Sequence, residues 1–329
     1  MNQTSKIVIT GAAGFIASCM ASHLNRLGYH QLYLVDDFSR EDKRANHEHL
    51  HCIARIDRAM IDDFFMTQHD IELVIHLGAR TDTTEMDYQI HEALNVVFSQ
   101  KVWTYCAEHQ IPMIYASSAA TYGDGALGYQ DSPEIVNQLQ PLNPYGVSKN
   151  EFDKWVLNQV AVGATCPTHW YGLKFFNVYG PNEYHKGRMA SVIFHAFHQI
   201  QLTGNMKLFR SHREDYSDGG QMRDFIYVKD VIDIIEWLFL HLPNSGLYNV
   251  GTGKAESFLA LAQSVFSSMQ VTENIQFIDT PEDIREKYQY FTEADMQKLR
   301  NVGYTKKFHS LQEGVNDYVR HYLMPHKIF

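Results

Sequence analysis

The feature that most constrains the fold is a glycine-rich turn between a short apolar run and a helical segment near the start of the chain. Residues 6–10 read Lys-Ile-Val-Ile-Thr and end at glycine, which is typical of a buried parallel strand. Residues 11–17 read Gly-Ala-Ala-Gly-Phe-Ile-Ala, and helical spacing follows from Phe15 to Leu27, with Gly28 as the expected helix end. This order predicts the first strand–turn–helix unit of a parallel α/β sheet.

The spacing of the small residues in this turn suits a bound pyrophosphate. Gly11 permits the tight turn, Gly14 lets the backbone approach the phosphates, and Ala17 lets the helix pack closely on the strand. The phosphates would then lie at the helix N-terminus, where backbone N–H groups bind anions. Asp36 ends the next expected strand, about 20 residues further on, where it can bind a ribose hydroxyl. The sequence therefore predicts a dinucleotide site.

The chain continues to alternate strands with helices as far as residue 176. Within this part, further strands are expected over 32–36, 73–77, 113–117 and 170–176, and a helix over about 92–109. One more strand of the sheet is expected later in the chain, over 246–250. This alternation predicts an α/β protein with a doubly wound parallel sheet of the Rossmann type. The alternation fails after Asn177, and 211–220 has neither helical nor strand period, so we expect a smaller mixed α/β domain there, with a return to the sheet near Phe225. We assign residues 1–176 and 225–253 to the dinucleotide-binding domain, and residues 177–224 and 254–329 to a substrate domain.

Composition argues against several classes of protein. The 28 Lys and Arg residues against 38 Asp and Glu give a net charge of −10, which disfavours nucleic acid as a partner. The four cysteines are scattered, as in a reduced cytoplasmic protein, and the 18 histidines lack zinc-site spacing, so we expect no metal. The apolar stretch 231–242 contains two acidic residues and is too short to span a bilayer. We expect a cytoplasmic homo-oligomer that has no membrane partner.

The segment Tyr145-Gly-Val-Ser-Lys149 is expected to carry the chemistry. Pro144 suits the first turn of a helix, so Tyr145 and Lys149 should lie one turn apart on the same face. There Lys149 can bind a nicotinamide ribose, and its charge is expected to lower the pKa of Tyr145. A tyrosine tuned in this way can accept a hydroxyl proton as hydride leaves for the cofactor. Ser118, just past strand 113–117, is positioned to bond the substrate oxygen that is oxidised.

Together these segments resemble the extended short-chain dehydrogenase/reductase family, which contains nucleotide-sugar epimerases and dehydratases. The matching stretches cover most of the chain: 11–17, 118–123, 145–149, 176–181, 223–228 and 249–253. Within the family, the chain is most similar to members that epimerise an ADP-linked heptose at carbon 6, in the stretches 115–123, 185–187, 189–192 with His195, 207–209, 254–258, 288–292 and 294–295. The resemblance implies an isomerase that uses tightly bound NADP, with NAD as the alternative, to oxidise an ADP-sugar to a transient ketone and reduce it from the opposite face.

The resemblance also assigns roles to individual residues. Two ketone faces require two acid/base groups, and the second is Lys186, opposite Tyr145; the alternative for Lys186 is a phosphate-binding or surface lysine. The implied catalytic residues are Ser118, Tyr145, Lys149 and Lys186. The implied cofactor contacts are Gly11, Gly14, Phe15, Ile16, Asp36, Asp37, Lys43, Leu77, Gly78, Ala79, Thr81, Asn95, Tyr145 and Lys149. The implied substrate contacts are Asn177, Lys186, Arg188, His195, Phe209, Arg223 and Tyr288.

Several alternatives stay open at the level of sequence. Asp36 favours NAD, whereas Arg40, Lys43 and Arg44 either neutralise the 2′-phosphate of NADP or form a solvated charge run. His195 is either a ligand or a core histidine. Arg188 stands where the family has a small hydroxyl residue, and the 211–220 insertion is longer than expected, so another nucleoside diphosphate-sugar is an alternative substrate.

Other reactions on the same fold compete with 6-epimerisation. A 4-epimerase remains an alternative, whereas a 4,6-dehydratase is disfavoured because Ser118-Ala-Ala stands where Thr-Asp-Glu would be expected. A catalytically silent dinucleotide-binding regulator is disfavoured by the intact Ser118, Tyr145 and Lys149.

Overall fold

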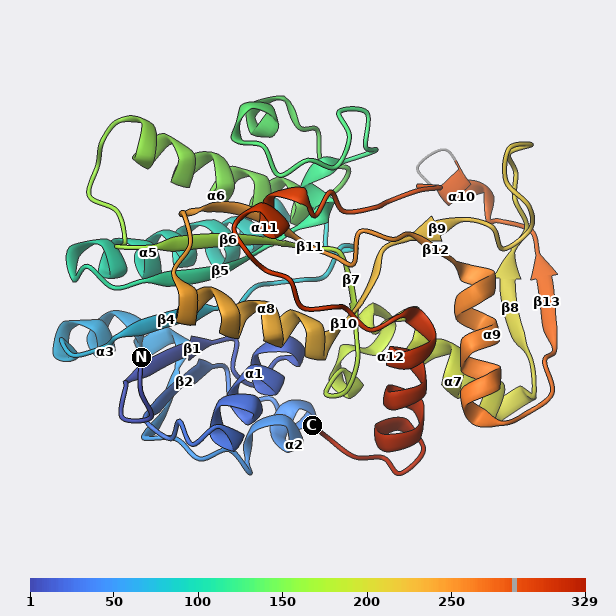
Figure 1. Ribbon diagram of the computed structural model, residues 1–329, viewed down its shortest axis with the longest axis horizontal. Coiled ribbons are helices and arrows are strands. Elements are labelled where there is room, and N and C mark those ends of the chain that lie inside the picture. The colour runs from blue at the N-terminus through green and yellow to red at the C-terminus, as the bar shows by residue number, and fades with distance from the viewer. Residues whose placement is uncertain (286–288) are drawn as a thin grey trace.

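A seven-stranded parallel sheet dominates the computed structural model, which describes residues 1–285 and 289–329 (Figure 1). Its strands are β1 (Ile7–Thr10), β2 (Leu32–Asp36), β3 (Ala54–Asp57), β4 (Leu73–His76), β5 (Met113–Ser118), β6 (Trp170–Phe175) and β11 (Gly246–Val250). Their order is β11-β6-β5-β4-β1-β2-β3, and every neighbouring pair is parallel. The order reverses between β1 and β4, and ligands of such sheets bind at this switch point, beyond the carboxyl ends of the strands.

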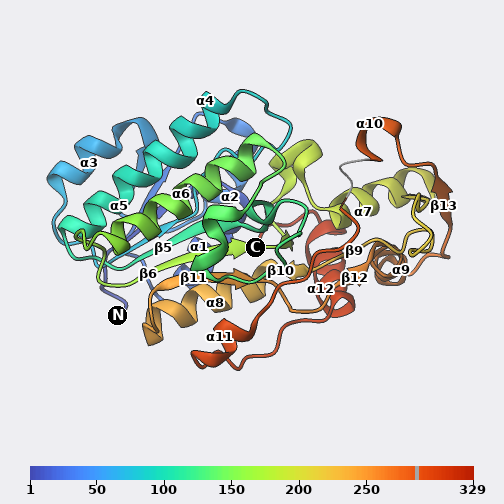
Figure 2. The ribbon, with the colours of Figure 1, turned by 90° about the horizontal axis from the view of Figure 1, so that it is seen from above.

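Helices cover both faces of the sheet. The helices are α1 (Phe15–Arg26), α2 (Arg44–His47), α3 (Ile61–Thr67), α4 (Tyr88–His91), α5 (Phe98–Glu108), α6 (Pro144–Ala161), α7 (Val192–Thr203), α8 (Val228–His241), α9 (Phe258–Met269), α10 (Glu282–Arg285), α11 (Gln297–Asn301) and α12 (Leu311–Tyr318). Figure 2 shows α3, α5 and α6 side by side on one face and α8 on the other. The predicted doubly wound α/β sheet is confirmed.

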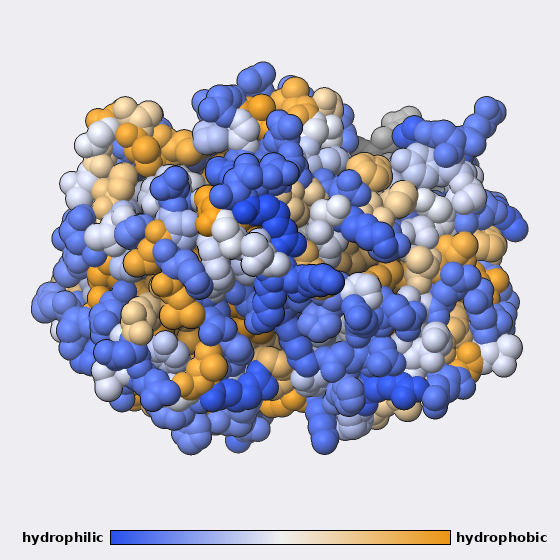
Figure 3. All heavy atoms as spheres, viewed as in Figure 1, coloured by the Kyte–Doolittle hydropathy of each residue, from blue (hydrophilic) through white to orange (hydrophobic). Residues whose placement is uncertain are grey.

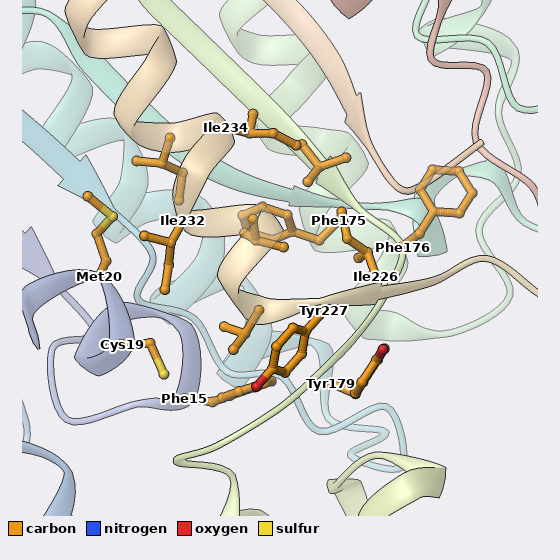
Figure 4. Packing of buried hydrophobic residues seen from close by; sticks show 14 of the residues in the cluster. Phe15, Cys19, Met20, Phe175, Phe176, Tyr179, Ile226, Tyr227, Ile232 and Ile234 are labelled. Atoms are coloured by element: carbon orange, nitrogen blue, oxygen red, sulfur yellow. The ribbon is translucent and has the colours of Figure 1, made fainter. Parts of the chain in front are cut away.

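The strands are buried on both faces because alternate side chains enter two separate cores. Ile7 and Ile9 of β1 belong to a cluster with Met20 of α1 and with α8, part of which is shown in Figure 4. Val8, between them, belongs to a second cluster with Trp103 of α5 and Phe152 of α6. Two-sided burial explains why these strands read as continuous apolar runs instead of alternating patterns.

The remaining strands form three two-stranded sheets. The pairs are β7 (Asn177–Tyr179) with β10 (Phe225–Tyr227), β8 (Met206–Phe209) with β13 (Ile275–Ile278), and β9 (Met222–Arg223) with β12 (Glu256–Ser257). The expected return to the main sheet near Phe225 is therefore wrong. The Phe176 N–H still bonds the Val250 carbonyl at the sheet's carboxyl edge, and β7 starts only beyond it, so β10 pairs with β7 outside the main sheet. The chain rejoins that sheet at β11; the two-domain division stays a prediction.

Two elements differ from the expectation in other ways. Strand β3 was not foreseen, because its short run alternates half-buried with exposed residues at the edge of the sheet. The helix expected from residue 92 begins earlier, at Tyr88, where the Asp87 side chain accepts the Gln89 N–H, and it continues as a π-helical segment, η3 (Glu92–Val97).

The surface in Figure 3 is covered mainly by hydrophilic residues, with apolar residues in scattered groups between them. Within residues 1–285 and 289–329, every helix is too short or too polar to cross a membrane.

Candidate active site

The glycine turn between β1 and α1 has a backbone that only small residues permit. Gly11 has a φ of +70°, and a Cβ there would lie 2.6 Å from the Cα of Gly78, which follows β4. The two loops at the switch point therefore touch through their backbones. Helix α1 starts directly after this turn, and within the described part of the chain no side chain caps its first N–H groups. These amides are thus suited to bind an anion.

A cavity of about 660 Å³ opens at this switch point. It brings together the predicted residues Gly11, Gly14, Phe15, Ile16, Asp36, Asp37, Lys43, Leu77, Gly78, Ala79, Thr81 and Lys186. It is also lined by residues that the sequence did not single out: Thr10, Val35, Arg58, Arg80, Asp82, Ile90, Leu94, Phe98, His185 and Met189. The other predicted residues that the structure describes do not line it. The backbone cradle and the polar end near Asp36 fit the two halves of a dinucleotide.

The carboxylate of Asp36 is occupied by bonds within the protein. One oxygen accepts the Ala13 N–H at 2.9 Å. The other accepts the Asp37 N–H at 2.7 Å and lies 3.2 Å from the ammonium of Lys43. Asp36 is buried, so it holds the glycine turn against β2 while Lys43 compensates its charge.

The basic residues near Asp36 divide into two groups. Arg40 and Lys43 line the cavity, whereas Arg44 lies at the surface in ion pairs with Glu41 and Glu48. The solvated charge run therefore describes Arg44 and fits Arg40 in part, since Arg40 is exposed and ion-paired with Asp42, whereas Lys43 is half-buried beside Asp36. Arg58 follows β3 and also lines the cavity, 3.7 Å from a carboxylate oxygen of Asp37. The alternation of Ala-Arg-Ile-Asp before Arg58 was the available signal for it.

The structure brings Ser118, Tyr145 and Lys149 together beside this cavity. Tyr145 lies in the first turn of α6, where the Asn143 side chain accepts the Gly146 N–H at 2.8 Å. Ser118 ends β5, and its hydroxyl forms a hydrogen bond with that of Tyr145. The Lys149 ammonium donates to the Ala116 carbonyl of β5 at 2.9 Å. Strand and helix thus fix all three side chains at the carboxyl edge of the sheet.

Burial decides the protonation of this group. Burial lowers the pKa of Lys149 to about 8, and the Asp153 carboxylate opposes that shift. Burial also raises the pKa of Tyr145, while the Ser118 hydrogen bond opposes the rise. The expectation that Lys149 lowers the Tyr145 pKa below its usual value is therefore wrong for the protein alone, because desolvation of the phenolate is the larger effect. Tyr145 holds its proton at neutral pH.

The helix formed by α4 and η3 connects the cavity to Tyr145. Ile90 and Leu94 line the cavity, while the ring of His91 lies 6.3 Å from that of Tyr145. Asn95 lies behind the wall: its amide donates to the Ser148 hydroxyl at 2.9 Å, and its oxygen accepts the Arg80 N–H at 2.7 Å. In this structure Asn95 therefore joins the loop after β4 to α6.

A buried ion pair that sequence reasoning missed fixes α6 on the sheet. Asp153 is two turns after Tyr145 on α6, and its carboxylate lies 2.7 Å from the ammonium of Lys174 on β6. The same carboxylate accepts the hydroxyls of Ser117 at 2.7 Å and Tyr115 at 3.1 Å, both on β5. One carboxylate thus links α6 to two adjacent strands.

Lys186 lines the cavity from the 3-10 segment η6 (Tyr184–Met189). Its ammonium is 5.5 Å from the centre of the Phe15 ring, at the start of α1. Burial lowers the pKa of Lys186, and Glu183 opposes the shift. Glu183 is itself buried and accepts the Ser191 N–H at 2.6 Å. A lowered pKa makes this ammonium a better proton donor than an ordinary exposed lysine.

Lys186 lines the cavity, whereas the other predicted substrate contacts among the described residues do not. Arg188 and His195 are exposed, and the His195 ring lies 3.3 Å from the Arg188 carbonyl, so the core-histidine alternative is wrong. Phe209 ends β8, half-buried. Asn177 pairs with Phe225, next to the β9 strand that carries Arg223. The Arg223 guanidinium donates to the carbonyls of Met222 and Gln289. Tyr288 lies outside the described residues.

Comparison with known proteins agrees with this arrangement. The sequence profile described as the NAD dependent epimerase/dehydratase family matches residues 7–251. The ADP-L-glycero-D-manno-heptose-6-epimerase of Fusobacterium nucleatum subsp. nucleatum is 46% identical, over 96% of this chain and 98% of its own length. The crystal structure of the enzyme of that name from Helicobacter pylori superimposes with a TM-score of 0.78 at 25% identity, covering 97% of this chain and 96% of its own.

A third relative shows what the fold alone leaves undecided. The UDP-N-acetylglucosamine 4-epimerase of Methanobrevibacter ruminantium superimposes with a TM-score of 0.79 at 21% identity, covering 98% of this chain and 99% of its own. Similar backbones therefore occur in epimerases named for different carbons.

Proposed function

The chain belongs to the NAD dependent epimerase/dehydratase family, and from this premise we propose that it interconverts ADP-D-glycero-D-manno-heptose and ADP-L-glycero-D-manno-heptose at carbon 6. The family and the chemistry of the site support an epimerase. The choice of sugar rests on the 46% identity to an enzyme of that name over nearly the whole chain.

One observation carries the choice of epimerisation: two side chains that can exchange protons come from separate parts of the chain, with Lys186 lining the cavity and Tyr145 behind its α4–η3 wall. Tyr145 is hydrogen bonded to Ser118 on one side, and Lys186 has a lowered pKa on the other. An enzyme that only oxidised an alcohol would need one such group. Hydride leaves from one face of the sugar carbon and returns to the other, so the ketone meets the cofactor in two orientations, and a proton carrier for each orientation suits inversion.

The roles of the residues follow from their surroundings. A nicotinamide dinucleotide, when bound, takes up the hydride and returns it. Tyr145 and Lys186 hold or move the proton of the carbon 6 hydroxyl, each for one face of the sugar. Ser118 orients that oxygen through its hydroxyl, and Lys149, a neighbour of the Ala116 carbonyl, binds the ribose next to Tyr145. We place the sugar nucleotide against Asn177, Arg188, His195, Phe209, Arg223 and Tyr288.

We further propose that the cofactor is NADP and that it stays bound between turnovers. The Asp36 carboxylate already accepts the N–H groups of Ala13 and Asp37, which leaves fewer acceptor positions for the 2′-hydroxyl of NAD. Arg40, Lys43 and Arg58 line the same end of the cavity and can bind a 2′-phosphate. Retention follows from the chemistry, because the ketone must be reduced before the cofactor leaves. Mass analysis of the cofactor released from denatured protein identifies it.

The test of function is direct. Incubation of the holoenzyme with ADP-D-glycero-D-manno-heptose should invert carbon 6 without net change in mass, as measured by NMR and mass spectrometry. Loss of the elements of water would identify a dehydratase. Inversion at carbon 4 of a UDP-hexose, with no action on the heptose, would replace the proposed substrate and leave the site chemistry in place.

A further inference from the structure

The turn that carries Lys186 makes little regular structure of its own, yet it is fixed from several directions. Residues 181–186 follow β7, and η6 is interrupted at Gly187, which has a φ of +52°. The contacts that hold this turn come from α1, from α2 and from residues 322–329, which are all distant in sequence. We call residues 322–329 the closing segment; Figure 1 shows it running from the end of α12 back toward α1 and α2.

Asn182 is the centre of these contacts. It is fully buried and has a φ of +75°. Its amide nitrogen donates to the Ser18 hydroxyl of α1 at 2.9 Å, and its side-chain oxygen accepts the Phe329 N–H at 2.8 Å. Its backbone carbonyl accepts the Asn46 amide at 3.0 Å. Every polar atom of this side chain is therefore bonded to a distant part of the chain.

Phe329 is itself anchored on α1. The Arg26 guanidinium lies 3.7 Å from the centre of the Phe329 ring, and the Lys229 ammonium of α8 lies 5.6 Å from it. The Ser22 hydroxyl donates to the Phe329 carbonyl at 2.9 Å. A cation over the face of an aromatic ring is attracted to the electron-rich face, so Arg26 holds the Phe329 ring on α1 and Lys229 adds a weaker contact from α8. Phe329 thereby joins the helix at the cofactor site to the turn that leads to Lys186.

A second attachment lies two residues before Lys186. The Tyr184 hydroxyl is within hydrogen-bonding distance of two carbonyls of the closing segment, 3.0 Å from that of Tyr322 and 3.1 Å from that of Lys327. The ring of His326 packs on Tyr184 with centroids 4.7 Å apart. The closing segment therefore holds the turn at two points, Asn182 and Tyr184, on the approach to Lys186.

We infer that the closing segment is a positioning element for Lys186, and that Phe329 and Asn182 are positioning residues of the reaction. The inference rests on the proposed role of Lys186 as an acid/base. Without the two attachments, the turn would keep its connection to β7 and the bond from Asn182 to Ser18 of α1. It would lose the contacts with the closing segment that limit its movement relative to Phe15, which the Lys186 ammonium faces. Displacement of a reacting group by about 1 Å can cost on the order of a hundredfold in rate.

The test uses substitutions of Phe329 in the holoenzyme. Phe329→Pro removes the N–H that Asn182 accepts and also the ring, whereas Phe329→Leu removes the ring and keeps the N–H. We expect Phe329→Pro to lower kcat by roughly ten- to a hundredfold, with little change in KM, and Phe329→Leu to have a smaller effect. Met324→Ala is the matched control, because Met324 belongs to the same segment and is exposed.

A double-mutant comparison separates positioning from general damage to the fold. In a Lys186→Met background, Phe329→Pro should leave the residual rate unchanged, because no lysine remains to be positioned. An additive loss in both backgrounds, or a kcat for Phe329→Pro equal to that of the unsubstituted enzyme, would overturn the inference.

Hydrogen–deuterium exchange tests the attachment without reference to activity. Backbone amides of residues 182–190 should exchange faster in Phe329→Pro than in Met324→Ala, while those of β1 and α6 should not change. Unchanged exchange in 182–190 would overturn the inference even if the enzyme is active. Faster exchange in an enzyme that epimerises no ADP-heptose would support the attachment and count against the proposed function.

Discussion

The two walls of the active site are constructed in different ways. The helical wall consists of Ser118, Tyr145 and Lys149, which are placed by the end of β5 and the first turns of α6. The loop wall consists of residues 181–189, with Lys186, and is placed by hydrogen bonds to side chains of α1 and α2 and to the backbone of the closing segment. Each wall carries one proposed acid/base residue, but one wall relies on regular backbone hydrogen bonds and the other on contacts between distant residues.

This difference has consequences for how each wall can fail. Two residues four apart on a helix keep their relative positions as long as the helix exists. A turn held by side chains can move when a single distant contact is lost, while the rest of the fold stays intact. We therefore expect substitutions near the helical wall to affect stability and activity together, and substitutions that loosen the loop wall to affect mainly the rate.

The largest expected effect compares the two acid/base groups directly. Tyr145→Phe and Lys186→Met should each lower kcat by on the order of a hundred- to ten-thousandfold, with cofactor still bound. With an analogue that carries an aldehyde at carbon 6, each single variant should retain partial hydride transfer, and the double variant should be inactive. If Lys186→Met raises KM and leaves kcat at saturation unchanged, Lys186 only binds the diphosphate, and the loop wall has no acid/base group.

The next effect concerns the stability of the helical wall. Asp153→Asn leaves the buried Lys174 ammonium without its charged partner, so the free energy of unfolding should fall by about 3–5 kcal/mol. Denaturant titration measures this loss. Asp62→Asn is the control, because its ion pair with Lys101 is exposed and should contribute under about 1 kcal/mol. Equal effects of the two substitutions would show that the buried network does not fix α6.

A pH dependence follows from the buried Lys149. Its folded pKa of about 8 lies below the ordinary value of 10.5, so between these pH values the unfolded chain binds more protons than the folded protein. Stability contributed by this group should therefore rise with pH across that window, by roughly 3 kcal/mol in total. Denaturant titrations of the unsubstituted protein and of Lys149→Met should diverge from pH 8 to 10.5; parallel curves would contradict the lowered pKa.

The smallest expected effect is on the affinity for the cofactor, which depends on basic residues in the loops beside Asp36. Arg58→Met and Lys43→Met should each weaken NADP binding by about tenfold, because each removes one charge-assisted hydrogen bond to the 2′-phosphate. Neither substitution should change NAD binding appreciably. Arg44→Met should change neither, because Arg44 is held at the surface by two glutamates. Calorimetry on cofactor-free protein measures both affinities. Tenfold tighter binding of NAD than of NADP would reject the proposed cofactor.

How far the sequence predicts the molecule can be judged from particular elements. The strand bounds Leu32–Asp36 and Gly246–Val250 agree with expectation, because buried parallel strands read as short apolar runs. Strand β3 escaped prediction, since an edge strand with half-buried residues carries a weak apolar signal. The pairing of β10 with β7 could not be foreseen either, because a three-residue apolar run does not specify which strand it will join.

The candidate site divides in the same way. The glycine turn and the Tyr145–Lys149 spacing were readable because turns and helices impose fixed spacings on nearby residues. Resemblance alone supplied Lys186. Arg58 and the Asp153–Lys174 pair were missed, since each acts together with residues from other parts of the chain.

By itself, the sequence determined the parallel sheet, the glycine turn at its switch point and the pairing of Tyr145 with Lys149 on one helix face. Local backbone geometry and the period of apolar residues fix these features. Only the tertiary structure decided that Asp36 is occupied by the glycine turn, that burial raises the pKa of Tyr145, and that Phe329 reaches Asn182. Those outcomes depend on desolvation and on contacts between residues far apart in sequence, and no local pattern encodes either one.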